Sequence, residues 1–307
     1  MSSHSKKQPA LKKITRGLTV GSVITGSTFF HGPPVLALGL TKLFKQSKKV
    51  DETNIKITNS WLSVNNWLID HVLANTQWDI SIDDDLDLNM QGRYLMMCNH
   101  QSWVDTTVNQ YFGLTRMPLT RFFTKWELIF IPFVGQAFKI LGFPMMKRHS
   151  KEQIAKNPEL KHRDMEEARK SCEQLLSQPF TLLNYLEGTR FTAEKHAQQK
   201  STFTNLLKPK AGGLALALNI LGDQIDALVD MTIVYPDGVP GYGEFWLGEV
   251  PRIAVNLRKI DIPAWVAGGN YEEDAEFREK FQQWVDQIWT DKDQLISEMK
   301  AKYPPVV

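Results

Sequence analysis

The sequence has only two cysteines in 307 residues, Cys98 and Cys172, and they lie in separate predicted elements without metal-ligand spacing. It therefore gives no support to a disulfide framework or a zinc site. Cys98 is expected to pack as a small hydrophobic side chain. Two isolated cysteines suit a folded domain that faces the cytoplasm.

Acidic residues are absent from the first 50 residues, which contain nine lysines and arginines. The rest of the chain has 27 basic and 34 acidic residues, so the net charge of +2 hides a basic N-terminal arm. Such an arm suits nucleic acid or anionic lipid. Residues 17–41 favour anionic lipid, because they contain no Asp, Glu, Lys or Arg and are rich in apolar side chains. We expect residues 1–50 to be a basic-flanked, helical membrane anchor, and we expect no nucleic-acid partner.

How this anchor meets the membrane stays open between two alternatives. Pro33-Pro34 should end or kink a helix. A helix over residues 17–32 would be about 24 Å long, short of the hydrocarbon core of about 30 Å. Basic residues on both flanks favour neither orientation. An in-plane or re-entrant hairpin and a kinked single span both fit; a signal peptide fits less well, since more lysines follow the prolines.

Short apolar runs alternate with helical patterns after the anchor. Strands are predicted at residues 94–98, 121–124, 143–146, 180–186 and 228–235, with two more inside 243–262. Helices are predicted around residues 61–72, after Asn157-Pro158, at 211–221 and around 277–288. The pattern predicts an α/β fold, a mixed sheet flanked by helices, in one domain over residues 51–307 that ends in strands and an amphipathic helix.

A histidine and an aspartate follow the first of these strands. On one continuous helix, residues five apart point roughly 140° away from each other. His100 and Asp105 therefore converge only if His100 precedes a helix and Asp105 lies in its first turns. Ser102 and Asp105 form a capping-box pattern that supplies this geometry. The alternative is that Asp105 acts as a local helix cap and nothing more.

Glu187-Gly188-Thr189-Arg190 follows the strand predicted at 180–186. Gly188 allows close approach of the backbone, and Arg190 can bind a phosphate through two nitrogens. The alternative is an ordinary polar turn with a surface Glu-Arg pair. Lys147-Arg148 ends another predicted strand and supplies further positive charge.

Three motifs thus follow one another: Asn99-His100-x4-Asp105, Gly142 to Arg148, and Glu187 to Arg190. In this order they resemble the motif series of the glycerolipid and lysophospholipid acyltransferases, the superfamily of 1-acyl-glycerol-3-phosphate acyltransferases. The branch that includes the lysocardiolipin enzymes is similar in further segments, namely His31-Gly32-Pro33, residues 191–196, residues 229–235 and Lys292-Asp293.

The sequence departs from the family pattern at two places. Tyr185-Leu186 stands where many relatives have Phe-Pro, and within the similar segment 229–235, the family's fourth motif, Met231 replaces the usual proline. Both departures bear on the acyl acceptor more than on the chemistry.

The resemblance implies a glycerophosphate acyltransferase-like fold and acyl transfer from a thioester to a glycerol hydroxyl. His100 would be the general base, and Asp105 would hold the other ring nitrogen of the imidazole. Ser102 is a candidate helix cap rather than a nucleophile. Backbone amides at the start of the helix could stabilise the tetrahedral oxyanion.

The resemblance also implies the residues that bind the substrate. Arg190, supported by Thr189, Gly188 and Glu187, would hold the phosphate of the acceptor, with Arg148 adding positive charge. Lys210 is a weaker candidate for the same role. The apolar residues 126–146 are either a membrane-facing lip or acyl-chain tunnel, or part of the core.

The sequence hypothesis is a membrane-bound enzyme that forms phosphatidic acid from 1-acyl-glycerol-3-phosphate. Its donor would be acyl-CoA or an acyl carrier protein, with no metal and no other cofactor. It would lie at the inner (cytoplasmic) membrane with its catalytic domain facing the cytoplasm. The alternatives are remodelling of another lysophospholipid and a catalytically silent lipid-binding protein, although a binding module would need neither His100 nor Asp105.

Overall fold

The computed structural model describes residues 10–42, 44, 47–146, 151–157 and 159–303. Its elements, in chain order, are α1 (Ala10–Thr41), α2 (Lys48–His71), β1 (Gln77–Ile82), β2 (Arg93–Cys98), α3 (Val104–Gly113), β3 (Thr120–Phe122), β4 (Thr124–Lys125), the 3₁₀ helix η1 (Trp126–Phe130), α4 (Val134–Ile140), β5 (Met145–Met146), α5 (Lys151–Lys156), α6 (Glu159–Leu175), β6 (Phe180–Tyr185), α7 (Ala193–Gln199), α8 (Gly212–Leu221), η2 (Gly222–Gln224), β7 (Ala227–Val234), α9 (Tyr242–Trp246), β8 (Arg252–Ile260), η3 (Ala264–Val266) and α10 (Ala275–Lys302). The predicted fold class, a mixed sheet flanked by helices, is confirmed.

The main sheet has six strands in the order β1-β8-β7-β2-β6-β3. Its neighbours run parallel except β7 and β8, which pair antiparallel from Leu228 opposite Ile260 to Val234 opposite Ala254. Strands β2 and β7 lie at the centre and are buried on both faces, which explains why their sequences are almost continuously apolar. The carboxyl ends of β7, β2 and β6 meet at one edge of the sheet.

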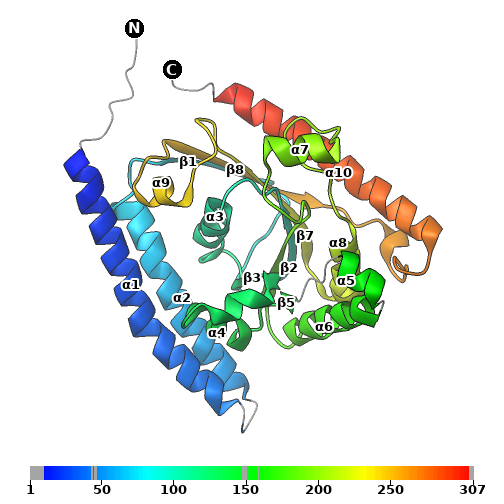
Figure 1. Ribbon diagram of the computed structural model, residues 1–307, viewed down its shortest axis with the longest axis horizontal. Coiled ribbons are helices and arrows are strands. Elements are labelled where there is room, and N and C mark those ends of the chain that lie inside the picture. The colour runs from blue at the N-terminus through cyan, green and yellow to red at the C-terminus, as the bar shows by residue number, and fades with distance from the viewer. Residues whose placement is uncertain (1–9, 43, 45–46, 147–150, 158, 304–307) are drawn as a thin grey trace.

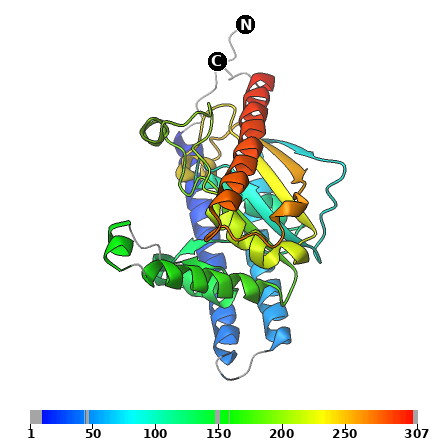
Figure 2. The same cartoon turned by 90° about the vertical axis from the view of Figure 1, so that its right-hand side faces the viewer.

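Helices cover both faces of the sheet and form a three-layer structure (Figures 1 and 2). Met96 and Cys98 of β2 point to the face covered by α1, α2 and α3. Leu95 and Met97 point to the other face, which α6, α8 and α10 cover. This alternation follows from the two-residue period of a strand. Both cysteines are free and buried, and burial raises the pKa of the Cys98 thiol, so the structure bears out its role as a packing residue.

Three predicted strands differ from the structure. Residues 243–262 contain one strand, β8, preceded by the short helix α9 rather than by a second strand; Glu244 accepts a hydrogen bond from the Gly241 amide and starts that helix. The strand predicted at 121–124 is divided between β3 and β4, and the one at 143–146 shrinks to the two residues of β5. β1 is a mostly exposed edge strand, and the sequence pattern gave no prediction for it.

The N-terminal segment forms a hairpin of two long helices, α1 and α2, with α1 along the outside of the molecule (Figure 1). Helix α1 continues through Pro33 and Pro34, so of the two expected effects, an end or a kink, the end of the helix does not occur there. Packing holds this turn: a Cβ on Gly32 would lie 2.9 Å from Phe133 Cβ, and His31 Nε2 lies 3.2 Å from Ser60 Oγ on α2. By length and composition alone, α1 is long and apolar enough to cross a membrane.

A buried charge cluster joins α10 to the central strand β7. Asp230 accepts hydrogen bonds from Lys292 Nζ at 2.6 Å and from Arg258 Nε at 2.9 Å, and Lys292 also donates to the Met231 carbonyl at 2.8 Å. Lys292 and Asp230 are both fully buried, so each charge depends on the other for its compensation. The neighbouring Asp293 receives the amides of Thr204 and Asn205, which ties the loop after α7 to α10.

Candidate active site

The imidazole of His100 and the carboxylate of Asp105 form the centre of the candidate site. His100 follows β2 and Asp105 lies in the first turn of α3, as the spacing predicts, and His100 Nδ1 is 2.8 Å from Asp105 Oδ2. The His100 side chain is 14% exposed, whereas Asp105 is buried. His100 Nε2 makes no hydrogen bond to any residue that the structure describes. The geometry therefore leaves one ring nitrogen held and the other available at the surface.

Asp105 also accepts three further hydrogen bonds. The backbone amides of Gln101 and Ser102 donate to its Oδ2 at 2.7 and 2.8 Å, and the Tyr235 hydroxyl donates to Oδ1 at 2.6 Å. Burial raises the pKa of Tyr235 well above its usual value, which keeps this hydroxyl protonated as a donor. These donors compensate the buried carboxylate and fix its orientation. The capping interpretation and the catalytic one therefore describe the same geometry.

Ser102 works as a local cap. Its Oγ accepts a hydrogen bond from the Val104 amide at 3.1 Å and donates to the Pro240 carbonyl at 2.6 Å. The Asp105 amide donates to the Ser102 carbonyl at 3.3 Å. The amides of residues 101, 102, 104 and 105 are thus already engaged. These four amides therefore give no support to the idea that the start of α3 stabilises an oxyanion.

Two tyrosines complete the surroundings of the His100–Asp105 pair, and both come from neighbouring strands. Tyr185, at the end of β6, stacks on the His100 ring with centroids 4.0 Å apart and planes inclined by 20°. Its hydroxyl receives a hydrogen bond from Asn109 Nδ2 at 3.3 Å. The sequence interpretation treated Tyr185 only as a departure from the family pattern and gave Tyr235 no role; their position at the ends of strands beside β2 was the available signal.

Asn99 fixes the end of β2 just before His100. Its Nδ2 donates to the Ile233 carbonyl and its Oδ1 accepts from the Ile233 amide, both at 2.9 Å. The side chain thereby imitates one more residue of the β2–β7 ladder. This contact holds the backbone at the point where the chain leaves the sheet for His100.

The third motif is attached to the His100 backbone on both sides. Glu187 is fully buried and accepts the His100 amide on Oε1 at 2.7 Å and the Leu207 amide on Oε2 at 3.0 Å. The Phe191 amide donates to the His100 carbonyl at 2.7 Å. Burial raises the pKa of Glu187 to about 7. Glu187 therefore holds the backbones of His100 and Leu207 from the protein interior, and its buried carboxyl group does not face a substrate.

Three basic side chains gather around the same loop. Arg190 is exposed, with its Cζ 4.8 Å from the centre of the Trp103 ring at the start of α3. Lys195 Nζ donates to Thr189 Oγ1 at 2.8 Å and to the Arg190 carbonyl at 3.0 Å. Gly188 has φ of +67°, and a Cβ there would lie 3.1 Å from Lys210 Nζ. Positive charge is thus concentrated beside His100, and Lys195 contributes to it although the sequence interpretation gave it no role beyond the resemblance of residues 191–196.

The predicted binding residue Arg148 lies outside the described residues. Among those that are described, no three histidine, cysteine, aspartate or glutamate side chains gather as metal ligands would. The polar groups that the structure does bring together are the hydrogen-bonded His100–Asp105 pair and the side chains of Arg190, Lys195 and Lys210.

A family model described as Acyltransferase matches residues 79–236, just over half of the chain. The chain belongs to the acyltransferase family. The resemblance to the glycerolipid branch is confirmed by two curated relatives. A 2-acyl-1-lysophosphatidylinositol acyltransferase of Saccharomyces cerevisiae is 25% identical over 253 residues, 68% of this chain and 62% of that protein. The 1-acyl-sn-glycerol-3-phosphate acyltransferase epsilon of Mus musculus is 24% identical over 238 residues, 70% of this chain and 60% of its own.

This acyltransferase-family chain also shares its fold with a solved structure. It is similar to the 1-acyl-sn-glycerophosphate (LPA) acyltransferase PlsC of Thermotoga maritima with a TM-score of 0.55 and 16% identity, over 94% of this chain and 97% of that one. The matches to the curated relatives span only about 60% of their length. The family and the fold are therefore established, while the reaction is inferred from the site.

Proposed function

We propose that this protein transfers a fatty acyl group from a thioester to the free hydroxyl of 1-acyl-glycerol-3-phosphate and forms phosphatidic acid. The observation that carries the proposal is the His100–Asp105 pair, with one ring nitrogen held at 2.8 Å and the other without a partner in the described part of the chain. The names of the curated relatives support a lysophospholipid as the acceptor.

The chemistry follows from the two ring nitrogens. Asp105 accepts a hydrogen bond from the Nδ1–H group of His100, which keeps its proton, so Nε2 carries the lone pair that removes the proton of the acceptor hydroxyl as its oxygen attacks the thioester carbonyl. The carbon–sulfur bond then breaks, and the imidazolium returns the proton to the thiolate leaving group. Asp105 stabilises the imidazolium in between, as the acid of a hydrolytic triad does. No serine nucleophile is needed, and Ser102 is occupied as a cap.

The acceptor phosphate is assigned to the basic side chains around the third motif. Arg190 is exposed beside Trp103, which keeps its guanidinium near the start of α3. Lys195 and Lys210 add charge from the same loop region. Together they would anchor an anionic group while His100 reaches the hydroxyl. Arg148 remains a predicted further cation.

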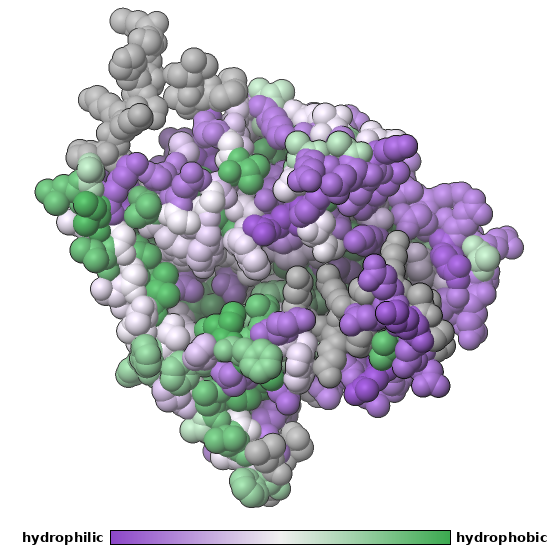
Figure 3. Space-filling view, in the orientation of Figure 1, coloured by the Kyte–Doolittle hydropathy of each residue, from purple (hydrophilic) through white to green (hydrophobic). Residues whose placement is uncertain are grey.

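The membrane surface is assigned to the outer side of α1 and to η1. Figure 3 shows hydrophobic residues gathered along α1 and over the region of α4. The exposed large apolar side chains there are Leu11, Ile14, Leu18, Phe29, Phe30, Leu40, Phe130 and Ile131. Arg16 near one end of α1 donates to the Leu247 carbonyl at 2.8 Å, and Lys42, just after the other end, donates to the Ile140 carbonyl at 3.4 Å.

A helix held to the domain at both ends favours the in-plane alternative over a single span. We place the protein at the inner membrane with its catalytic domain in the cytoplasm. Cysteines introduced at Lys12 and Thr41 should then react with an impermeant maleimide from the same side of a sealed vesicle. Labelling from opposite sides would contradict the in-plane placement.

A second candidate acceptor is another lysophospholipid, because one curated relative is named for lysophosphatidylinositol. The two candidates share the base; they differ in the group beyond the phosphate and, for the acceptor in that relative's name, in which glycerol hydroxyl is free. Membranes bearing wild-type protein should be assayed for radiolabelled acyl transfer from acyl-CoA and from acyl carrier protein. The acceptor panel is 1-acyl-glycerol-3-phosphate, lysophosphatidylinositol and lysophosphatidylcholine.

The matched variants for this assay are His100→Ala and His71→Ala, since His71 is an exposed histidine on α2. The proposal expects phosphatidic acid as the main product, lost in His100→Ala and retained in His71→Ala. A different preferred acceptor would select the second candidate. If no donor and acceptor pair gives a product that depends on His100, the protein is a lipid-binding member of the family instead.

A further inference from the structure

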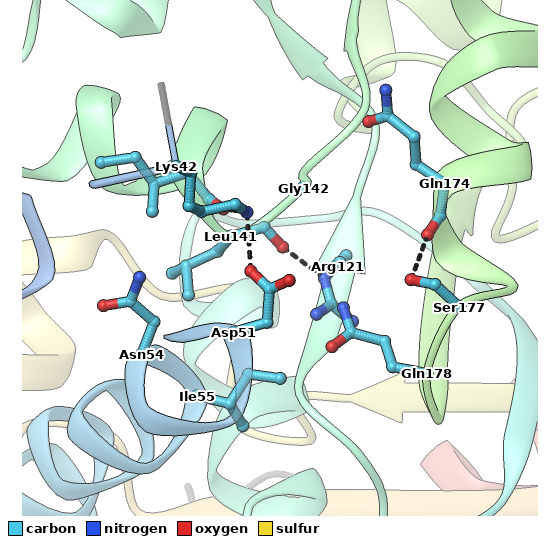
Figure 4. A pocket seen from close by; sticks show the side chains of 11 residues that line it. Lys42, Asp51, Asn54, Ile55, Arg121, Leu141, Gly142, Gln174, Ser177 and Gln178 are labelled. Atoms are coloured by element: carbon cyan, nitrogen blue, oxygen red, sulfur yellow. Dashed lines mark hydrogen bonds and ion pairs between the residues drawn. The ribbon is translucent and has the colours of Figure 1, made fainter. Parts of the chain in front are cut away.

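A second feature of the domain is a cavity of about 340 Å³, and Figure 4 shows the side chains that line it. Its walls come from the start of α2, the edge strand β3, the loop after α4 and the segment between α6 and β6. Ser177 and Gln178, which line it, precede β6, whose other end carries Tyr185 and Glu187. A six-residue strand is about 20 Å long, so the cavity is separate from the site around His100.

The central feature of this cavity is the guanidinium of Arg121. Arg121 is fully buried, and its Nε donates to the Leu141 carbonyl at 2.7 Å. Its Nη1 and Nη2 are buried without a hydrogen-bond partner among the residues that the structure describes. Burial lowers the pKa of Arg121 only to about 10, so the side chain is still charged at neutral pH. Buried, unpaired guanidinium nitrogens are costly and uncommon, which calls for a partner from outside the chain.

A second unpaired polar side chain lines the same cavity. Asn54 on α2 is 1% exposed, and neither its Nδ2 nor its Oδ1 has a hydrogen-bond partner within the described part of the chain. An amide in this state offers one donor group and one acceptor to the same ligand. Arg121 and Asn54 are 67 positions apart in the chain and lie on different elements, so local turn geometry does not explain why both line this cavity.

The remaining charges in the cavity cancel each other. Lys42 Nζ lies 2.6 Å from Asp51 Oδ1, and this ion pair forms one wall (Figure 4). Asp51 also favours the charged form of Arg121 through its field, but the Lys42 contact already compensates it. One lysine, one aspartate and one arginine leave the cavity with a charge of about +1. Among the described residues that line the cavity, the charge left without a partner is therefore the guanidinium of Arg121.

We propose that this cavity is a second anion site, distinct from the catalytic one, which binds a phosphate group that carries a small hydroxylated substituent. The Nη1 and Nη2 pair fits two phosphate oxygens in the bidentate geometry typical of arginine. Asn54 Nδ2 can donate to the phosphate, and Asn54 Oδ1 can accept from a hydroxyl of the substituent.

This phosphate has two possible sources. It can be a soluble phosphate ester or the headgroup of an anionic lipid. Leu40 and Phe44, 60% and 92% exposed, stand next to Lys42 in the chain and bring this end of the hairpin close to the membrane surface assigned to α1. The proposal does not depend on the acyl transfer reaction.

The test measures the unfolding temperature of the purified full-length protein against ligand concentration. In detergent, the probes are inorganic phosphate and glycerol 3-phosphate. In nanodiscs, phosphatidylcholine alone is compared with phosphatidylcholine plus phosphatidylglycerol, whose phosphate carries a small hydroxylated group. All arms use the Arg190→Ala background, which removes the main predicted phosphate anchor of the catalytic site.

The proposal expects a saturable rise in unfolding temperature in the Arg190→Ala protein. Adding Arg121→Met should raise the apparent Kd at least about tenfold, the worth of one lost charge-assisted hydrogen bond. Asn54→Leu should also weaken the effect, and it should fold well because it replaces an unpaired buried amide by an apolar group of similar size. If Arg121→Met does not fold, the apparent Kd of the Asn54→Leu protein tests the proposal instead.

The arms also identify the source of the phosphate. A response to glycerol 3-phosphate in detergent assigns the site to a soluble ester. A response to phosphatidylglycerol in nanodiscs, with none to glycerol 3-phosphate, assigns it to a lipid headgroup. Two results would overturn the proposal. One is an equal response with and without Arg121→Met; the other is no response of the Arg190→Ala protein to any probe, which would leave only water in the cavity.

Discussion

The Asp105→Asn substitution tests what the carboxylate does for His100. The side chains are nearly the same size, but the amide can no longer balance an imidazolium. At 2.8 Å and an effective dielectric constant of about 20, a full charge pair is worth roughly 6 kcal/mol. With about half a charge on the imidazole in the transition state, roughly 3 kcal/mol is lost, which is about 10²-fold in kcat.

The hydrogen-bond pattern decides how the new amide will turn. If its NH₂ faced His100, it would also face the amide donors of Gln101 and Ser102, which now donate to Oδ2. Turning the NH₂ toward Tyr235 avoids this conflict, because that hydroxyl can rotate and accept. The oxygen then still accepts from His100 Nδ1, so the tautomer is kept. We therefore do not expect the larger fall in kcat, about 10⁴-fold, that a wrong histidine tautomer causes in a hydrolytic triad.

The assay is the steady-state rate of acyl transfer at saturating acceptor, with unfolding temperature and membrane binding measured on the same preparations. Asp85→Asn, an exposed acid in the turn after β1, is the matched control. We expect kcat to fall about 10²-fold with KM nearly unchanged. A fall of less than about fivefold, or the same fall in the control, would refute the role given to Asp105.

Three further predictions concern the surroundings of the site. Burial raises the pKa of Glu187 from 4.5 to about 7, so its contribution to stability is present below pH 4.5 and is lost as pH rises through 7. The free energy of unfolding of the wild type, relative to Glu187→Gln, should therefore fall by about 3 kcal/mol between pH 4 and 8, and parallel curves would contradict this. Arg190→Ala should raise KM for a phosphorylated acceptor about tenfold while kcat changes little, with Arg163→Ala on α6 as the control; an effect on kcat alone would remove the anchor role. Lys292→Met leaves Asp230 without its fully buried partner and should cost about 3 kcal/mol in chemical denaturation, whereas a cost below about 1 kcal/mol would show that Arg258 alone compensates the charge.

The parts of the site that the sequence predicted are those set by local geometry. His100 and Asp105 are five residues apart, and the Ser102 capping pattern places one before the helix and the other inside it, as the structure has them. The central strands β2 and β7 were equally accessible to prediction, because strands buried on both faces have almost continuous apolar sequences.

Features that depend on the order of strands or on distant packing could not be predicted. Tyr185 and Tyr235 meet the His100–Asp105 pair because β6 and β7 flank β2, and nothing local in their sequences sets that order. Helix α1 continues through Pro33 and Pro34 because α2 and Phe133 pack against that turn. The polar atoms of Arg121 and Asn54, which have no partner among the described residues, share one cavity only after the edge strand and α2 are assembled.

The central claim is that His100 removes the proton of the acceptor hydroxyl. Its most direct test is single-turnover acyl transfer by the purified His100→Gln protein at saturating acceptor, beside His71→Gln as the control. The account predicts a rate about 10² to 10⁴ times lower than wild type for His100→Gln, with unfolding temperature and membrane binding unchanged, and a wild-type rate for the control. A His100→Gln rate within a few-fold of wild type would contradict the account.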